Sequence, residues 1–490
     1  MEDPGNLRRR GGSICSNPIF CYIRSMADYS GYLSPFSWRY GTAEMRRLWS
    51  EKHKRELWRR IWVSLARVES RFGLTTEGQV AELESRAGDI DIARSLEIEE
   101  EIRHDLMAEI KVFAEQCPKA GGIIHLGATS MDIEDNADAL RIRESLVLVR
   151  ARLAGLLSSF AEKIEDYAGL PVMAFTHLQP AEPTTFGYRC AVWAQDLLAG
   201  FSELTDVQHS IRGKGFKGAV GTSASYCELV GKENLSQFED ALGKELGLAF
   251  YPVTTQTCSR LQEYRTLSAL AGLGAALHKI AFDLRILQSP PIGEVSEPFA
   301  DKQIGSSAMP FKRNPINSEK IDSLARLLAS FPQVAWNNAA LSLLERTLDD
   351  SANRRTILPE AFLICDELLK TASKIIDGLV LDETAIRLTF EKYGPFACTE
   401  RVLMAMAKSG ADRQETHERL RRHALAAWTE IKAGRENPLV ARIGADEFFS
   451  RFIGSGELAL LMDADAYLGD SVERSRNFAD TIKGKIAVLD

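Results

Sequence analysis

The chain has 490 residues, of which 45% are hydrophobic and 26% are charged, with a net charge of −8 and a pI near 5.7. This acidic balance argues against a general nucleic-acid-binding protein, and we expect no nucleic-acid partner. The length allows about two to four domains with a large buried core. The eight cysteines include no C-x-x-C pair, which indicates free thiols in a reducing compartment, and we expect a cytoplasmic protein.

The first residues differ in character from the rest of the chain. Residues 1–27 combine Arg8-Arg9-Arg10 with a short, interrupted apolar stretch, and Glu2 and Asp3 are unusual for a transit peptide. We therefore predict a flexible N-terminal extension, with Met26 as a second candidate start that N-terminal sequencing would identify. No apolar run reaches the roughly 18 residues needed to span a bilayer, so we expect no membrane segment.

Helical periodicity begins after this extension. Apolar residues recur at helical spacing from 43 to 74, and helical segments continue from 76 to 115 with a break near Gly88. A polar stretch that contains Gly121-Gly122 and His125 to Ser130 interrupts the pattern. The sequence therefore predicts an N-terminal helical domain over 28–129.

Five long helices are predicted in the middle of the chain. Each has roughly 25–35 residues, far above the average of about 11–12, and would be about 40–50 Å long. Broad apolar faces indicate a bundle shared between subunits, with a monomeric bundle as the alternative. The helices are expected over residues 132–167, 185–211, 259–288, 317–346 and 353–379, in a central domain over 130–381.

The remaining segments complete the predicted architecture. Polar loops are expected at 169–185, 213–225 and 293–316. Shorter helices, with breaks at 394–395, 410, 437–438 and 454–456, form a C-terminal helical domain over 382–490. We expect no strand-rich region and no internal repeat.

Reactive residue types collect in the predicted loops. His177 lies in a polar stretch and is suited to acid–base chemistry, although a single histidine is more often structural. Ser306 and Ser307 could be simple loop residues, or one could act as a base stabilised by Lys312. The segment from Glu345 to Arg355 contains three arginines that could bind a phosphate, or it could be a salt-bridged helix junction.

Several cofactor patterns are absent from the sequence. Gly272-Leu273-Gly274 lacks the third glycine of a dinucleotide site and lies in a predicted helix. There is no phosphate-binding G-x-x-x-x-G-K-[ST] loop, and His417 and His423 are too far apart on a helix to share a metal. We expect no metal and no cofactor.

The stretch Gly305-Ser306-Ser307-Ala308-Met309-Pro310-Phe311-Lys312-Arg313-Asn314-Pro315 resembles the signature loop of the fumarase/aspartase superfamily, and most closely that of its adenylosuccinate lyase family. Separate motifs agree with this resemblance and occur in the matching order from about residue 33 to the last helices. They are Ser37–Tyr40, Arg103–Asp105, His125–Ser130, Thr176–Pro180, Gln256-Thr257, Ser259-Arg260 and Glu345–Arg355.

The resemblance implies an all-α, three-domain fold whose long-helix bundle is shared in a homotetramer, with active sites formed by several subunits. It also implies a lyase that releases fumarate by β-elimination. The substrates would be adenylosuccinate, which gives AMP, and the succinyl-aminoimidazole-carboxamide ribotide SAICAR, which gives AICAR in purine synthesis.

The resemblance also implies roles for individual residues. Ser306 would be the general base, with Ser307 as the alternative, and His177 the general acid. Glu297 would orient and charge this histidine. Lys312 and Asn314 would stabilise the charge that develops on the substrate carboxylate.

Further residues would bind the substrate. One departs from the family pattern, because Lys320 stands where many relatives have arginine, and lysine lacks the bidentate geometry. The implied binding residues are Arg39, Tyr40, Arg103, His104, Asp105, Thr129, Ser130, Gln256, Asn314, Lys320, Arg346, Ser351 and Arg355.

Two alternatives remain open from the sequence alone. The chain could be argininosuccinate lyase or another amino-acid lyase, although the arginine-rich segment favours a phosphorylated substrate. It could also be a non-catalytic structural protein, since the superfamily includes lens crystallins, but the retention of His177, Ser306, Lys312 and Asn314 argues against this.

Overall fold

A computed structural model describes residues 30–300 and 302–487, so the predicted extension over 1–27 lies outside the described residues. The N-terminal part is helical, and its helices begin with side-chain caps such as Ser50, whose Oγ accepts from the His53 amide. Its elements are α2 (Pro35–Trp38), α3 (Ala43–Leu48), α4 (Glu51–Arg71), α5 (Glu77–Arg86), α6 (Ile92–Ile102), α7 (Asp105–Gln116) and η1 (Gly121–Ile123).

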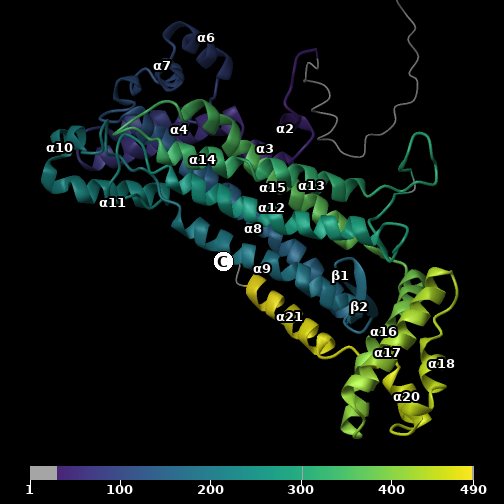
Figure 1. Cartoon of the computed structure of the whole chain (residues 1–490). Helices are drawn as coiled ribbons and strands as arrows, with labels where there is room; N and C mark the ends of the chain where they lie inside the picture. Colours follow the sequence, from purple (N-terminus) through teal and green to yellow (C-terminus); the bar gives the residue numbers. More distant parts are fainter. Residues whose placement is uncertain (1–29, 301, 488–490) are drawn as a thin grey trace, which may run out of the picture.

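A bundle of long helices forms the body of the molecule (Figure 1). Its helices are α8 (Ser130–Asp166), α9 (Phe186–Ser210), α12 (Leu261–Leu287), α13 (Ile316–Leu328), α14 (Phe331–Ala340) and α15 (Ser351–Asp377). The shorter α10 (Ala224–Val230), η2 (Lys232–Asn234) and α11 (Leu235–Leu246) lie between α9 and α12 in the chain. One continuous apolar core runs through the bundle, as the broad apolar faces predict.

The bundle has two ends that carry different predicted site residues. Three helices, α8, α12 and α15, begin at the same end, because Asp135 and Asp138 of α8 contact Arg260 before α12 and Arg354 of α15. We call this the Ser130 end. The connection from α8 to α9 and the connection from α12 to α13 lie at the opposite end, which we call the His177 end (Figure 1). With 37 residues, α8 separates the two ends by roughly 55 Å.

Strands are present where the sequence predicts only a loop. Between α8 and α9, β1 (Pro171–Thr176) pairs antiparallel with β2 (Gln179–Thr185), and β3 (Val295–Ser296) pairs with β4 (Val380–Leu381). The prediction of an irregular segment over 169–185 is therefore wrong. Pro180 and Pro183 suggest a loop, but a two-stranded ribbon tolerates prolines because each strand has an unpaired outer edge.

The helix predicted over 317–346 is also wrong in extent. It is divided into α13 and α14, and the segment after Ala340 is not helical. The division occurs at Ala329-Ser330, before Pro332 in the first turn of α14. Proline cannot donate the amide hydrogen bond that a continuous helix would require there.

The C-terminal helices form a smaller body with a second apolar core, which includes Met173 of β1. They are α16 (Glu383–Lys408), α17 (Arg413–Lys432), α18 (Leu439–Gly444), α19 (Glu447–Ser450), α20 (Ser455–Leu461) and η3 (Ala464–Ala466). Contrary to the predicted break, α16 continues through Gly394-Pro395. The last helix, α21 (Ser471–Ile486), packs against α8 and α9 instead, so it belongs to the bundle rather than to the predicted 382–490 domain.

One bundle helix is more apolar than the sequence analysis recognised. By length and composition α12 could cross a membrane, and 56% of its most apolar 18-residue window is buried. It contacts α9, α13, α14 and α15. Packing at the centre of the bundle therefore accounts for its composition.

The close packing of α8 against α9 leaves no space for a side chain at Gly187, in contrast to Gly155. A Cβ at Gly187 would lie 2.6 Å from Ala168 Cα and from the Ile164 carbonyl oxygen, whereas a Cβ at Gly155 would meet nothing within 4 Å. Gly187→Ala should therefore lower the free energy of unfolding by about 1–3 kcal/mol. The matched Gly155→Ala should raise it by about 0.5–1 kcal/mol, since alanine favours a helix interior. Chemical denaturation measures both, and equal effects of the two variants would contradict the close packing.

Candidate active site

The first group of predicted site residues meets at the Ser130 end. Arg355, in the first turns of α15, pairs with Asp105 of α7 at 2.9 Å. Ser130 Oγ, at the start of α8, lies 3.5 Å from His104 Nε2. The starts of α7, α8 and α15 thus bring together residues that are distant in sequence. Arg103, which precedes this group, has φ of 58° and ends α6, so the chain turns sharply into α7.

A cavity of about 110 Å³ lies among these residues. Its lining combines acidic and basic side chains with the Ser351 hydroxyl and the rings of Trp49 and Trp58. Among the predicted binding residues, Asp105, Ser351 and Arg355 line it. This composition suits a small polar ligand that carries negative charge.

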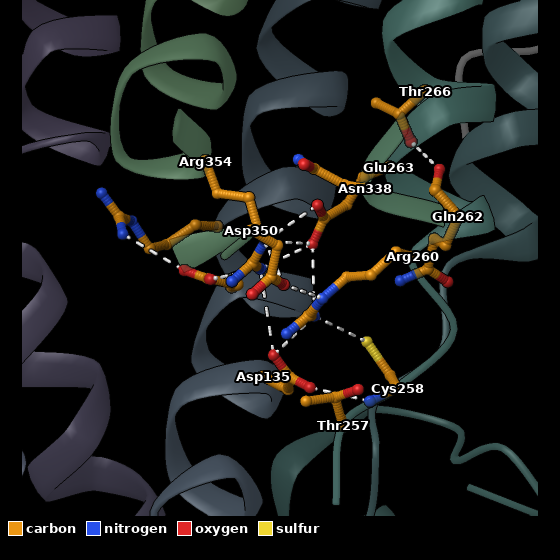
Figure 2. A network of polar contacts seen from close by, with 12 residues as sticks. Asp135, Thr257, Cys258, Arg260, Gln262, Glu263, Thr266, Asn338, Asp350 and Arg354 are labelled. Atoms are coloured by element: carbon orange, nitrogen blue, oxygen red, sulfur yellow. Dashed lines mark hydrogen bonds and ion pairs between the residues drawn. The ribbon is translucent and has the colours of Figure 1, made fainter. Parts of the chain in front are cut away.

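A buried network of ion pairs lies beside this cavity (Figure 2). Arg260 donates to Asp135 at 2.8 Å and to Asp350 at 2.7 Å, and the Nε of Arg354 donates to Glu263 at 2.9 Å. Burial alone would raise the pKa of Asp135, but Arg260 and Arg354 outweigh it, so the pKa is lowered. The charged form of Asp135 is therefore favoured, and its ion pair helps to hold Arg260 in a fixed position.

The network also fixes two neighbouring loops. Asp135 accepts a hydrogen bond of 2.7 Å from the Cys258 amide, which holds the segment that carries Gln256. The Gln256 amide donates to the Glu345 carbonyl at 3.2 Å, and Arg346 pairs with Asp350 at 3.0 Å. Gln256 and Arg346 therefore lie at the same end of the bundle as Ser351 and Arg355.

Sequence reasoning missed this network, although Arg354 was one of the three arginines considered for phosphate binding. In the structure Arg354 is buried and its N–H groups donate to Glu263 and Asp138, so these groups stabilise the fold rather than bind a phosphate. A partial signal was available, since Arg260 and Glu263 are three residues apart and Asp350 and Arg354 four.

Thr129 has a structural contact at the same end. It is the N-cap of α8, and its amide donates to Asp132 at 2.9 Å. Asp132 is fully buried, pairs with Lys214, and accepts the amides of Lys217 and Gly218 at 3.1 and 3.2 Å. This carboxylate thus ties the glycine-rich segment over 213–225 to the start of α8.

A second group lies along α15, away from its start. Glu367 accepts the Gly41 amide at 3.2 Å and pairs with Lys320 at 2.8 Å. It therefore places the Arg39-Tyr40 segment close to Lys320. Arg39 is exposed, and its guanidinium lies 5.9 Å from the ring centroid of Tyr40.

His177 occupies the tip of the β1–β2 hairpin. His177 and Leu178 form its two-residue turn with φ of 53° and 59°. Both values fall in the left-handed region, which residues other than glycine adopt rarely and which is frequent at functional sites. The imidazole is exposed at the His177 end of the bundle.

Ser306 accepts two backbone hydrogen bonds. Its Oγ accepts backbone amide hydrogen bonds from Met309 at 3.1 Å and from Ala308 at 3.3 Å. These donors favour a negatively charged oxygen, while the side chain of Ser307 is exposed. The geometry thus favours Ser306 over Ser307.

The signature loop is closed on itself by Asn314 and Gly305. Asn314 Nδ2 donates to the Gly305 carbonyl at 3.2 Å, and a Cβ at position 305 would lie 2.0 Å from the Lys312 carbonyl oxygen. Only glycine fits there. Lys312 itself is exposed and follows a turn in which its amide donates to Met309.

Glu297 does not contact His177 within the described chain. Its two carboxylate oxygens accept from the amides and side chains of Asn317 and Ser318, at 3.0 to 3.2 Å. It therefore caps the start of α13. Each oxygen has this role already, so a pairing with a histidine would be additional to these contacts.

The predicted residues do not form one site within a single chain. The group around Ser130, Ser351 and Arg355 lies at one end of the bundle, and His177 and the signature loop lie at the other (Figure 1). The 27 residues of α12 separate the signature loop from the Ser130 end by about 40 Å. No side chain spans that distance.

Known proteins match this chain over most of its length. Residues 75–327 match the lyase family, and residues 395–478 match the adenylosuccinate lyase C-terminus. The chain is 39% identical to adenylosuccinate lyase of Schistosoma mansoni, over 93% of this chain and 96% of that protein. It is 38% identical to the Saccharomyces cerevisiae adenylosuccinate lyase, over 92% of this chain and 95% of that one.

Solved structures share the fold. The 3-carboxy-cis,cis-muconate lactonizing enzyme of Pseudomonas putida has a TM-score of 0.82 at 24% identity, covering 91% of this chain and 99% of its own. A fumarate lyase from Mesorhizobium sp. BNC1 has a TM-score of 0.79 at 24% identity, with 90% and 98% covered. Fold and matches together define a lyase with the fumarase/aspartase architecture. Within that class, the chain belongs to the adenylosuccinate lyase family, which confirms the resemblance inferred from the motifs.

The buried network predicts a large effect on stability. Arg354→Met should lower the free energy of unfolding by about 3–5 kcal/mol, because it removes a cation from the buried Glu263. The matched Arg387→Met removes an exposed pair with Glu391 and should cost no more than about 1 kcal/mol. Denaturant unfolding compares the two, and a small loss for Arg354→Met would contradict the assigned importance of the network.

Proposed function

We propose that this chain eliminates fumarate from adenylosuccinate to give AMP, and from SAICAR to give AICAR. The observation that carries the proposal is the similarity to adenylosuccinate lyases over nearly the whole of both chains. The arginine-rich Ser130 end supports a phosphorylated substrate, since Ser351 and Arg355 line a cavity suited to an anion.

In the proposed reaction Ser306 is the general base. It removes the proton from the carbon next to a carboxylate of the succinyl group, and the electron pair forms the double bond of fumarate as the carbon–nitrogen bond breaks. The amides of Ala308 and Met309 support this role because they stabilise the alkoxide. Lys312 and Asn314 would stabilise the negative charge that develops on the carboxylate.

His177 is the proposed general acid, which protonates the departing nitrogen. Its exposed position at the tip of a rigid two-residue turn supports contact with a group outside its own chain. Glu297 of another subunit could then pair with the imidazole and raise its affinity for a proton. Arg39, Tyr40, Lys320, Gln256 and the residues at the Ser130 end would hold the phosphate, the base and the carboxylates.

We infer a homotetramer with shared active sites from the separation of the two ends. Residues needed in one site lie about 40 Å apart in one chain, so a second chain must supply the missing part. Exposed leucines support this inference. Leu341, Leu344 and Leu348, in the segment that follows α14, are 65%, 80% and 71% exposed, and such a patch is typical of a protein interface.

Turnover of adenylosuccinate tests the function. The purified chain should convert it to equimolar AMP and fumarate, resolved by chromatography, and no conversion would refute the proposal. Ser306→Ala should reduce kcat about 100- to 10,000-fold, because a positioned base contributes that much. Ser307→Ala is the matched control and should retain most of the activity. A larger loss for Ser307→Ala would transfer the role of base to Ser307.

Mixing two inactive variants tests the shared site. Ser306→Ala and Arg355→Met damage opposite ends of the bundle, so hybrid tetramers should contain sites in which both residues are intact. About a quarter of the wild-type activity should return in an equal mixture, as expected for random assembly. Each variant taken alone through the same mixing procedure is the control. Hybrids detected by native mass spectrometry without recovered activity would place both residues in one chain's site.

A further inference from the structure

Glu134 lines the cavity at the Ser130 end, but none of the roles proposed above involves it. It lies four residues after Ser130 and four before Asp138, so the three side chains share one face of α8. Glu134 lines the cavity together with Ser351 and Arg355. It is therefore next to the residues proposed to bind the anionic part of the substrate.

The other carboxylates that line this cavity each have a cation. Glu51 pairs with Lys54 at 2.7 Å, and Asp105 pairs with Arg355 at 2.9 Å. Asp138 pairs with Arg354 at 3.0 Å and with Arg141 at 3.3 Å. These pairs use every arginine and lysine of the lining.

Glu134 has no such partner. Within the described residues, its side chain makes no ion pair and no hydrogen bond. Burial, followed by the charges of Asp105, Asp138 and Asp135, raises the pKa of Glu134 to about 8, and Arg355 compensates only in part. These surroundings favour the neutral carboxyl group over the carboxylate.

The protonation of Glu134 decides the charge of the lining. Four cations face Glu51, Asp105, Asp138 and Glu134. The cations of the lining already have carboxylate partners, because Arg354 also pairs with the buried Glu263, so an ionised Glu134 would add a negative charge without a partner. An anion is therefore bound more readily when Glu134 is neutral.

We propose that Glu134 is a specificity-determining residue that, as a neutral carboxyl group, adds no negative charge beside Arg355 and Ser351, where an anionic group of the substrate would bind. This inference rests on the proposed function and deepens it. The neutral carboxyl can also donate a hydrogen bond to the anion, which an ionised carboxylate cannot do. Loss of the proton both adds a negative charge and removes this donor.

The sign of the pH dependence follows from this assignment. Below a pKa of about 8 the carboxyl is neutral and the substrate binds well. Above it, Glu134 ionises and repels the anion, so KM should rise roughly tenfold toward about pH 9.5. The substrate phosphate does not interfere, because its second pKa is about 6 and it is fully charged throughout this range.

Glu134→Gln tests the proposal, since glutamine keeps the shape and a donor but cannot ionise. KM for adenylosuccinate should rise with pH in the wild type and remain flat in Glu134→Gln, while kcat follows the same profile in both. The matched control is Glu69→Gln, which removes another carboxyl whose pKa burial raises to about 8, but which lies on α4 outside the cavity. Its KM profile should match that of the wild type. Parallel profiles for wild type and Glu134→Gln, whether both rising or both flat, would overturn the proposal.

Two readouts that require no turnover separate this inference from the proposed function. Infrared difference spectra between about pH 7 and pH 9.5 should show a carboxylic-acid absorption that wild type loses near pH 8 and that Glu134→Gln lacks. AMP binding followed by calorimetry in two buffers should show proton uptake near that pH in the wild type only. If adenylosuccinate is not converted but the absorption is present, the proposed function fails and the protonation state stands. If the absorption is missing, the role of Glu134 is refuted whatever the activity.

Discussion

The buried ion pairs among Asp135, Arg260, Glu263, Asp350 and Arg354 are the interaction on which the arrangement of the Ser130 end depends. Charged groups in an apolar interior are stable only when each has a partner, so the geometry of every member constrains the others. These residues belong to the start of α8, the start of α12 and the start of α15 with the segment before it. The ion pairs therefore hold these three long helices in fixed relative positions. Ser130, Gln256 and Arg355, which lie near the starts of the helices, are positioned with them. The residues that meet at this end come from distant segments, and the ion pairs hold these segments in fixed positions.

The same long helices create a constraint at the other end. Because α8 and α12 are rigid rods, they keep His177 and the signature loop away from the cavity that contains Arg355. A shorter bundle could have closed a complete site within one chain. Here the helices instead carry different predicted site residues at their two ends, and in the proposed tetramer their apolar faces would provide the surface on which further copies assemble. The bundle keeps the predicted site residues of one chain apart. In the proposed tetramer, the same bundle would bring site residues of different chains together, so the architecture and the proposed catalysis depend on one another.

Sequence reasoning succeeded where the signal is local and failed where it is not. The helices α8, α9, α12 and α15 were predicted because an apolar stripe repeats over many turns, and the lyase family was recognised because its motifs are short and contiguous. The β1–β2 hairpin was missed because its turn uses His177 and Leu178 in place of the glycine or asparagine that normally marks such a turn. The break before Pro332 was overlooked although the proline was visible. The ion pair between Asp138 and Arg354, 216 residues apart, has no local signature.

Ser306 and Glu134 illustrate how surroundings, rather than residue type, set the state of a proton. A serine hydroxyl is an unlikely base in water, yet two backbone amides directed at its oxygen stabilise the anion. A glutamate is normally charged, yet burial and the charges of three neighbouring carboxylates favour its neutral form. The two environments act in opposite directions, one donating hydrogen bonds to an oxygen and the other removing the group from water among like charges. In the proposed elimination from a highly anionic substrate both effects have a use, because the base must lose its proton at one side of the site while the opposite side avoids adding negative charge.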